Sequence, residues 1–265
     1  MFKDGTKKLH ILSDFDRTLT KEYVDGKKIN SLISILRDEG YLTEDYPEKA
    51  KALFAKYHSI EIDHNISISE KKKAMHEWWV KHFELLIKSW LNIRDIEKSV
   101  RSNNIIFRKG LKEFLDNLKE KNIPFVVLSS SGLGINSISL ALERDSLLHN
   151  NTYIVCNDFE WDEEGNMIGY KEPVIHVFNK DETILHEFPF YEKIKERKNV
   201  ILLGDSIGDL GMVKGFDYDN LITIGFYNEL DNKNLDLYRE KFDVVITGDA
   251  DFEYVNKLLK RIIKL

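Results

Sequence analysis

The chain has 265 residues, of which 42% are hydrophobic and 11% aromatic, and its formal net charge is -6. This composition is typical of a folded protein with a sizeable core, and it excludes a disordered chain. The acidic balance argues against a general nucleic-acid binder, which would usually be basic. The single cysteine, Cys156, excludes a disulfide within the chain and a cysteine-rich zinc site.

The first residues, MFKDGTKKLHILSDFD, contain a short apolar run that leads directly into charged residues. They have neither the apolar region of a signal peptide nor the pattern of a transit peptide. No segment approaches the ~20 apolar residues that a membrane span needs. These features predict a cytoplasmic protein that binds neither membranes nor nucleic acids.

The first predicted strand is the apolar run KLHILS at residues 8–13. A helical block follows at 30–104, where we expect no strand. Within it, Ser67 is followed three residues later by Glu70, which is a capping-box pattern. This pattern predicts the start of a helix over residues 67–90, in which apolar residues recur at helical spacing.

After about residue 105, apolar strands alternate with amphipathic helices. We predict helices over residues 110–122, 135–145 and 190–198. We predict strands over residues 123–131, 199–206, 221–228 and 243–247. Two further strands are expected within 152–170, separated by the turn DEEGN. This alternation indicates βαβ units and a mostly parallel sheet. We therefore predict an α/β fold with a Rossmann-like core at residues 1–28 and 105–265, and an inserted helical cap at 29–104.

Three predicted strands end in polar residues, within HILSDFD, FVVLSSS and VILLGDSIGD. Ligands bind outside the carboxyl ends of parallel strands, so Asp14, Asp16, Asp205 and Asp209 are expected to converge there. Four carboxylates repel one another unless a cation is present, and oxygen ligands favour Mg²⁺. The serine hydroxyls at 129–131 and nearby backbone amides are suited to holding the oxygens of a phosphate group.

These motifs carry a family resemblance. DFDRTLT resembles the DxDxT signature of the haloacid-dehalogenase-like (HAD) phosphatase superfamily, VVLSS its second motif and LLGDSIGD its acidic fourth motif. Longer stretches, HVFNK at 176–180, LLGDSIGDLGM at 202–212 and IEID with SEKKKAMHEWW within 60–79, resemble the cytosolic pyrimidine 5′-nucleotidase family, type III. The resemblance extends from about residue 8 to 265 and includes the helical cap.

The resemblance implies a role for each motif residue. Asp14 would be the nucleophile that becomes an aspartyl-phosphate, and Asp16 would protonate the leaving oxygen and then deprotonate the attacking water. For this role the pKa of Asp16 should be raised. Thr18 would fix the turn that carries both acids. Ser129 would bind the phosphoryl oxygens beside the backbone amide of Ser130, although the motif can also be read one residue later.

The resemblance also implies a lysine and a metal. Lys180 would lie near the nucleophile and stabilise negative charge in the transition state. Mg²⁺ would be bound by Asp14, the backbone carbonyl of Asp16, Asp205 and, directly or through water, Asp209.

Selectivity would come from the cap, where the resemblance maps a base-contacting glutamate onto Glu77. A carboxylate there would accept hydrogen bonds from cytosine or from a methylated guanine. The competing interpretation is an exposed helix acid that pairs with Lys73 or Lys81. Trp78, Trp79 and Trp90 are expected to belong to the core of the cap rather than to a platform for the base.

The resemblance implies a monomeric, Mg²⁺-dependent 5′-nucleotidase that hydrolyses CMP and UMP to nucleoside and phosphate. Two alternatives use the same chemistry: a preference for 7-methylguanosine monophosphate, and transfer of the phosphoryl group to another nucleoside. A non-catalytic binding module would lack the nucleophile or the acid, but Asp14 and Asp16 are both present. A dehalogenase would not need Asp16.

Overall fold

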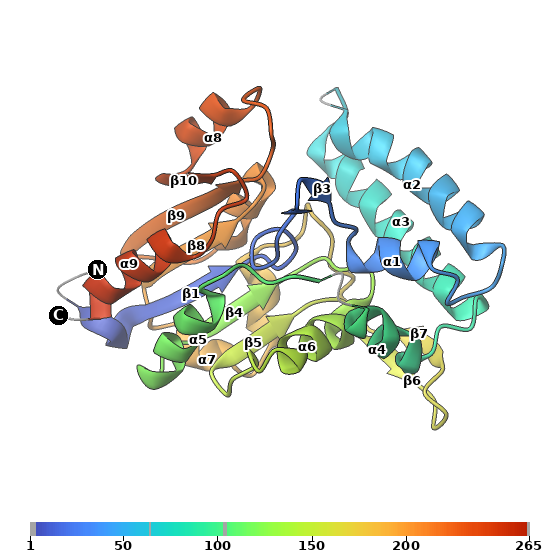
Figure 1. Ribbon diagram of the computed structural model, residues 1–265, viewed down its shortest axis with the longest axis horizontal. Coiled ribbons are helices and arrows are strands. Elements are labelled where there is room, and N and C mark those ends of the chain that lie inside the picture. The colour runs from blue at the N-terminus through green and yellow to red at the C-terminus, as the bar shows by residue number, and fades with distance from the viewer. Residues whose placement is uncertain (1–3, 64, 103–104, 264–265) are drawn as a thin grey trace.

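The centre of the molecule is a parallel six-stranded sheet in the order β10-β9-β8-β1-β4-β5 (Figure 1). This computed structural model describes residues 4–63, 65–102 and 105–263. The strands of the sheet are β1 (Leu9–Ser13), β4 (Phe125–Leu128), β5 (Thr152–Val155), β8 (Asn199–Gly204), β9 (Asn220–Tyr227) and β10 (Val244–Thr247). The predicted α/β class with a parallel sheet is confirmed.

Helices cover both faces of this sheet. The α-helices after the first strand are α1 (Leu32–Asp38), α2 (Tyr46–Ile62), α3 (Ile68–Lys88), α4 (Ile93–Arg101), α5 (Leu111–Glu120), α6 (Gly134–Arg144), α7 (Tyr191–Ile194), α8 (Leu235–Lys241) and α9 (Glu253–Ile263). Shorter 3₁₀ helices are η1 (Gly5–Lys8), η2 (Glu182–Glu187) and η3 (Ile207–Val213), and two hairpins are formed by β2 (Tyr23–Val24) with β3 (Lys27–Lys28) and by β6 (Phe159–Trp161) with β7 (Met167–Tyr170).

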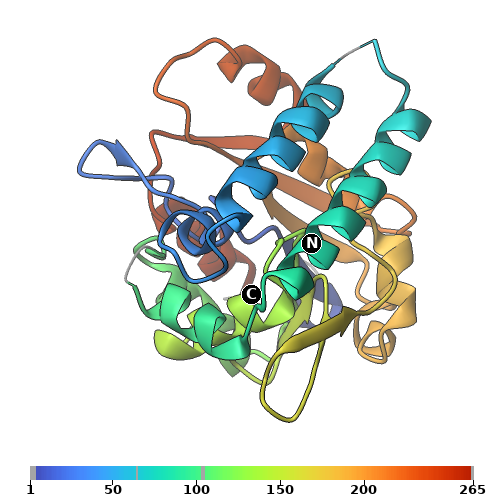
Figure 2. The same cartoon turned by 90° about the vertical axis from the view of Figure 1, so that its right-hand side faces the viewer.

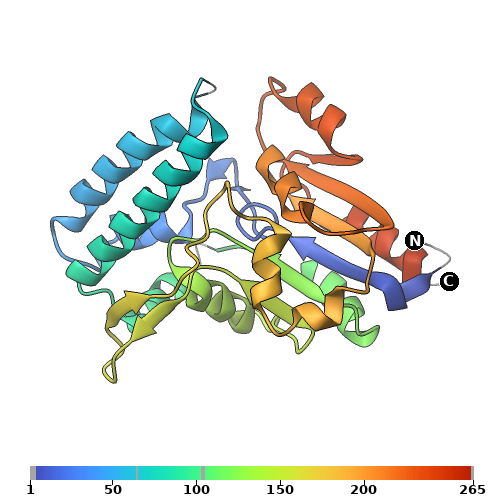
Figure 3. The same cartoon turned by 180° about the vertical axis from the view of Figure 1, so that it is seen from behind.

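The alternation of side chains along the strands produces two apolar layers. Ile11 and Val127 pack on one face with α5, α6 and α9, which lie in front of the sheet in Figure 1. Leu12 and Val126 pack on the other face with Ile194 of α7, which is nearer the viewer in Figure 3. A strand buried on both faces reads as a continuous apolar run, and this is why these strands could be located from the sequence.

Between β3 and α5 the chain forms the helical insertion, in which α2 and α3 lie side by side (Figure 2). The predicted capping box is present at the start of α3. The hydroxyl of Ser67 accepts a hydrogen bond from the backbone N–H of Glu70 at 3.2 Å, and the Glu70 carboxylate accepts one from the backbone N–H of Ser67 at 3.1 Å. The pair satisfies two helix N–H groups that would otherwise lack partners.

The predicted turn DEEGN joins β6 to β7, and the hairpin packs on α3. The single strand expected before this turn is in fact two strands, β5 in the main sheet and β6 in the hairpin. The ring of Phe83 on α3 lies 5.1 Å from the ring of Phe159 and 5.2 Å from that of Tyr170, measured between centroids. The hairpin therefore supports the insertion from the core side. None of the helices among the described residues is long and apolar enough to cross a membrane.

Candidate active site

The strand order explains how residues from distant motifs meet. Strands β8, β1 and β4 are neighbours, so their carboxyl ends lie together at one edge of the sheet. A cavity of about 350 Å³ opens there, between this edge and the helical insertion. Its wall includes Asp14, Asp16, Ser129, Ser130, Lys180, Asp205 and Asp209, as well as Arg17, Ser31, Leu32, Ile33, Glu61, Trp79, Ser131, Gly132, Val177 and Ser206.

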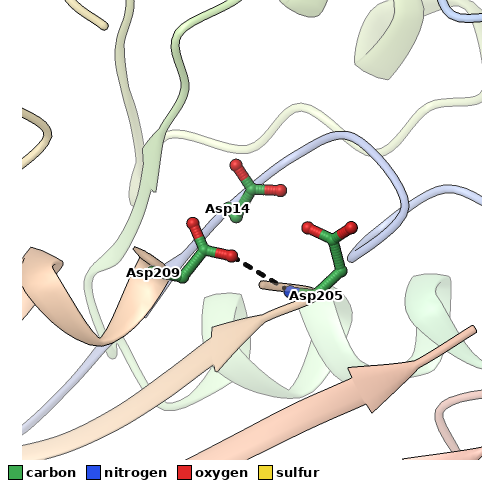
Figure 4. A group of neighbouring side chains, drawn as sticks. All are labelled: Asp14, Asp205 and Asp209. Carbon is green, nitrogen blue, oxygen red and sulfur yellow. Dashed lines mark hydrogen bonds between the residues drawn. The ribbon is translucent and has the colours of Figure 1, made fainter. Parts of the chain in front are cut away.

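Three carboxylates form the floor of this cavity (Figure 4). Asp14, Asp205 and Asp209 each offer one oxygen, and these three oxygens lie within 4.8 Å of one another. Burial raises the pKa of Asp14 to about 7, even though the ammonium group of Lys180 lowers it. Burial and the charges of Asp14 and Asp209 also raise the pKa of Asp205. A divalent cation would relieve this repulsion, so the donor set fits a hard metal ion.

Lys180 joins two of these acids. Its ammonium group pairs with Asp14 and lies 2.9 Å from Asp209. The other oxygen of Asp209 accepts a hydrogen bond from the backbone N–H of Asp205 at 3.1 Å (Figure 4). It accepts another from the backbone N–H of Ser206 at 2.9 Å. Both oxygens of Asp209 are therefore engaged, and this arrangement favours contact between Asp209 and a metal through water.

Asp16 lies two residues after Asp14, where the strand has ended and the chain turns. Burial raises the pKa of Asp16, although Arg17 and Lys180 lower it. A raised pKa favours the protonated form that a general acid requires. Thr18 donates a hydrogen bond to the Asp14 carboxylate at 3.1 Å, so its hydroxyl ties the turn back to the end of β1.

The loop after β4 carries the serines. The buried hydroxyl of Ser129 accepts a hydrogen bond from the backbone N–H of Ser131 at 3.2 Å. Ser130 is less buried and also lines the cavity. Ser129 and Ser130, the two candidates for the serine of the second motif, therefore both line the cavity.

Glu77 does not reach the cavity. Its carboxylate pairs with Lys81 and lies 3.9 Å from the ammonium group of Lys56 on the exposed side of α3. Residues two apart on a helix are rotated by about 200° around the helix axis, so Trp79 and Glu77 project to nearly opposite sides of α3. Trp79 lines the cavity and is also stacked within the helical insertion, with its ring 5.5 Å from that of Trp78 and parallel within 3°. Trp90, which was expected in the same core, is instead 74% exposed, because it lies just beyond the end of α3.

The insertion contributes a different carboxylate, Glu61, at the end of α2. Nδ1 of His58 lies 3.0 Å from a carboxylate oxygen of Glu61. The ammonium group of Lys71, which is buried, donates to the backbone carbonyl of Glu61 at 2.6 Å. Interpretation of the sequence missed Glu61 as a site residue, although it stands inside the IEID stretch that carried the resemblance.

This chain is similar to known 5′-nucleotidases over almost its full length. The family model described as pyrimidine 5′-nucleotidase (UMPH-1) matches residues 17–263. The 7-methylguanosine phosphate-specific 5′-nucleotidase of Homo sapiens is 33% identical over 98% of this chain and 87% of its own length. The protein of the same name from Drosophila melanogaster is 34% identical over 98% of this chain and 82% of its own.

The chain is also similar to a solved structure of a 5′-nucleotidase. A crystal structure of cytosolic 5′-nucleotidase IIIB bound to cytidine is 31% identical and superposes with a TM-score of 0.87, covering 99% of this chain and 88% of the other. A phosphoserine phosphatase is 20% identical with a TM-score of 0.56 over 96% of this chain and 99% of its own, a likeness that shows the fold alone.

Proposed function

Because the chain belongs to the pyrimidine 5′-nucleotidase family and is a 5′-nucleotidase of HAD-like fold, we propose that it hydrolyses nucleoside 5′-monophosphates through an aspartyl-phosphate on Asp14. One observation carries the proposal. The two acids of the first motif, Lys180 and the serine loop line a single cavity, and Glu61 and Trp79 of the insertion line the same cavity. The site can therefore hold a phosphate and a base at the same time.

Asp14 and Asp16 divide the chemistry. A carboxylate oxygen of Asp14 attacks phosphorus, the bond from phosphorus to O5′ breaks, and the proton of Asp16 goes to O5′ so that the nucleoside leaves neutral. A water molecule then attacks the phosphorus of the aspartyl-phosphate and gives its proton to Asp16. The bond to Asp14 breaks, and phosphate is released with both side chains restored.

The remaining groups stabilise charge and position the phosphate. Lys180 pairs with Asp14 and would balance the charge that develops on the phosphoryl oxygens, while Ser129 or Ser130 would donate hydrogen bonds to those oxygens. Asp14, Asp205 and the backbone carbonyl of Asp16 would hold Mg²⁺, with Asp209 contacting it through water. When bound, Mg²⁺ would supply positive charge to the phosphoryl oxygens.

The lining of the insertion favours bases that present hydrogen-bond donors. The Glu61 carboxylate can accept from the amino group of cytosine, or from both the ring N–H and the amino group of a guanine. The indole of Trp79 stacks best on a cationic ring, and methylation at N7 makes guanine cationic. We therefore place 7-methyl-GMP first and CMP second among the substrates, with UMP behind them because uracil offers only its ring N–H.

The proposal extends to the domains of the chain, its oligomeric state and its compartment. We propose residues 29–104 as the cap and residues 1–28 with 105–265 as the catalytic core. The chain would act as a cytoplasmic monomer with a nucleotide as its partner, and without binding nucleic acids or membranes. The relative with a solved structure is described as cytosolic, which supports this compartment.

The test is phosphate release from 7-methyl-GMP, CMP, UMP, GMP and AMP, with Mg²⁺ and with a chelator. Wild type should release phosphate only with Mg²⁺, and Asp14→Asn should release none. Absence of release from every nucleotide with Mg²⁺ present would contradict the proposed function. Release by Asp14→Asn at the rate of wild type would contradict the covalent mechanism.

A further inference from the structure

A buried arginine outside the sequence motifs holds the turn that carries Asp16. Arg108 stands between the helical insertion and α5, and its side chain is fully buried. Its guanidinium group donates a hydrogen bond to the carbonyl of Thr18 at 2.9 Å and another to the carbonyl of Arg17 at 2.6 Å. These carbonyls belong to the two residues that directly follow Asp16.

The guanidinium group is itself fixed from the far end of the chain. It lies 3.0 Å from a carboxylate oxygen of Asp249 and donates to the side-chain oxygen of Asn228 at 2.8 Å. It also lies over the ring of Phe226, 4.5 Å from the centroid. The amide group of Asn228 donates a second hydrogen bond to the carbonyl of Arg17, at 2.9 Å.

Asp249 extends the network to the chain that leads into the insertion. Its two carboxylate oxygens accept hydrogen bonds from the backbone N–H groups of Glu22 and Tyr23, each at 3.0 Å. The segment from Arg17 to Tyr23 is therefore attached at both ends to one buried ion pair.

The turn needs such support because its backbone is unusual. Arg17 has a φ of 60°, a left-handed conformation that side-chain-bearing residues adopt at a cost. Carbonyl oxygens on consecutive residues must be held in fixed directions for this conformation to persist. A planar guanidinium group offers several N–H donors in a rigid fork, which the single ammonium group of a lysine cannot reproduce.

We infer that Arg108 is a positioning residue for Asp16: its ion pair with Asp249 and its bonds to the Arg17 and Thr18 carbonyls keep the acid–base carboxyl in line with the leaving oxygen. The inference rests on the proposed function, in which Asp16 protonates the nucleoside and later activates water. A misplacement of about 1 Å is enough to cost on the order of 100-fold in rate.

The experiment compares two leaving groups in the full-length protein with Mg²⁺. A nucleotide needs a proton on its leaving oxygen, whereas p-nitrophenyl phosphate releases a phenolate that leaves without one. In Arg108→Lys, turnover of the nucleotide that wild type hydrolyses fastest should fall about 100-fold. The first turnover of p-nitrophenyl phosphate should stay within about twofold of wild type. The intermediate should then hydrolyse slowly, giving a burst of p-nitrophenolate of one equivalent.

Three variants provide the controls. Asp16→Asn removes the acid and base directly, and it should show slow nucleotide turnover together with the burst of p-nitrophenolate. Asn228→Ala removes one bond to the Arg17 carbonyl without deleting a buried charge, and it should give the same pattern at lower amplitude. Arg197→Met removes a guanidinium group that donates to the carbonyls of Thr6 and Leu9, both at 3.0 Å, at the other end of β1, and it should leave the ratio between the two substrates unchanged.

The outcomes separate the two proposals. If Asp16→Asn shows the burst and Arg108→Lys slows the first turnover of both substrates by one common factor, Arg108 is merely structural and the inference fails alone. Unchanged kinetics on both substrates in Arg108→Lys would equally overturn it. If Asp16→Asn itself shows no difference between the leaving groups, the acid–base role in the proposed function is wrong.

Discussion

Replacement of Glu61 by glutamine tests which glutamate of the insertion reads the base. Glu61 lines the cavity, whereas Glu77 is half exposed and paired with Lys81, so Glu77→Gln is a matched control from the neighbouring helix. A hydrogen bond to a charged group contributes about 1.5–3 kcal/mol, which corresponds to about 10- to 150-fold in kcat/KM. Glu61→Gln should lose this factor on 7-methyl-GMP and CMP.

The assay is phosphate release under kcat/KM conditions for both nucleotides and for p-nitrophenyl phosphate, which carries no base. Activity on p-nitrophenyl phosphate should stay unchanged in Glu61→Gln, because the phosphate site is intact. Glu77→Gln should match wild type on all three substrates. Equal losses on the nucleotides and on p-nitrophenyl phosphate, or a loss of nucleotide activity in Glu77→Gln alone, would refute the assignment of Glu61 to the base.

Three further changes have defined outcomes. A Cβ at Gly132 would lie 2.6 Å from the ring of Trp79, so Gly132→Ala should displace the indole and remove about 1–3 kcal/mol of stacking from nucleotides, seen as lower kcat/KM with normal activity on p-nitrophenyl phosphate. Burial lowers the pKa of His82 from 6.5 to about 4, so the folded state binds fewer protons than the unfolded state between these values, and stability falls as the pH falls through them. Urea unfolding should show that the loss of stability between pH 7 and pH 5 is smaller by about 2 kcal/mol in His82→Gln than in wild type. Saturating Mg²⁺ should raise the Tm of wild type by about 5–10 °C, and Asp205→Asn should abolish this gain while raising the Tm of the metal-free protein, because it removes one of the repelling carboxylates.

Local patterns were sufficient for most elements of the fold, although the helix expected over 190–198 already ends at Ile194. The capping box at Ser67 and Glu70 marked the start of α3, since both partners lie within one turn of the same helix. The strands could be located because burial on both faces leaves continuous apolar runs, and the turn DEEGN because its residues favour a reversal of the chain. The sequence did not reveal that the β6–β7 hairpin packs on α3, since ring contacts such as that between Phe83 and Phe159 join segments far apart in the chain.

The sequence by itself determined the chemistry of the cavity floor. Asp14, Asp205 and Asp209 stand in short motifs that follow β1 and β8, and parallel strands bring their carboxyl ends to one edge, so their convergence followed from the motifs and the strand rule. Lys180 stands in a loop, and only the family resemblance indicated its place. Only the tertiary structure decided which glutamate faces the cavity, because Glu61 and Glu77 are both glutamates of the helical insertion and differ in the direction in which their side chains leave the helix. It also decided that Arg108 reaches Asp249, 141 positions away, because a contact between distant segments depends on how whole elements pack and leaves no local pattern.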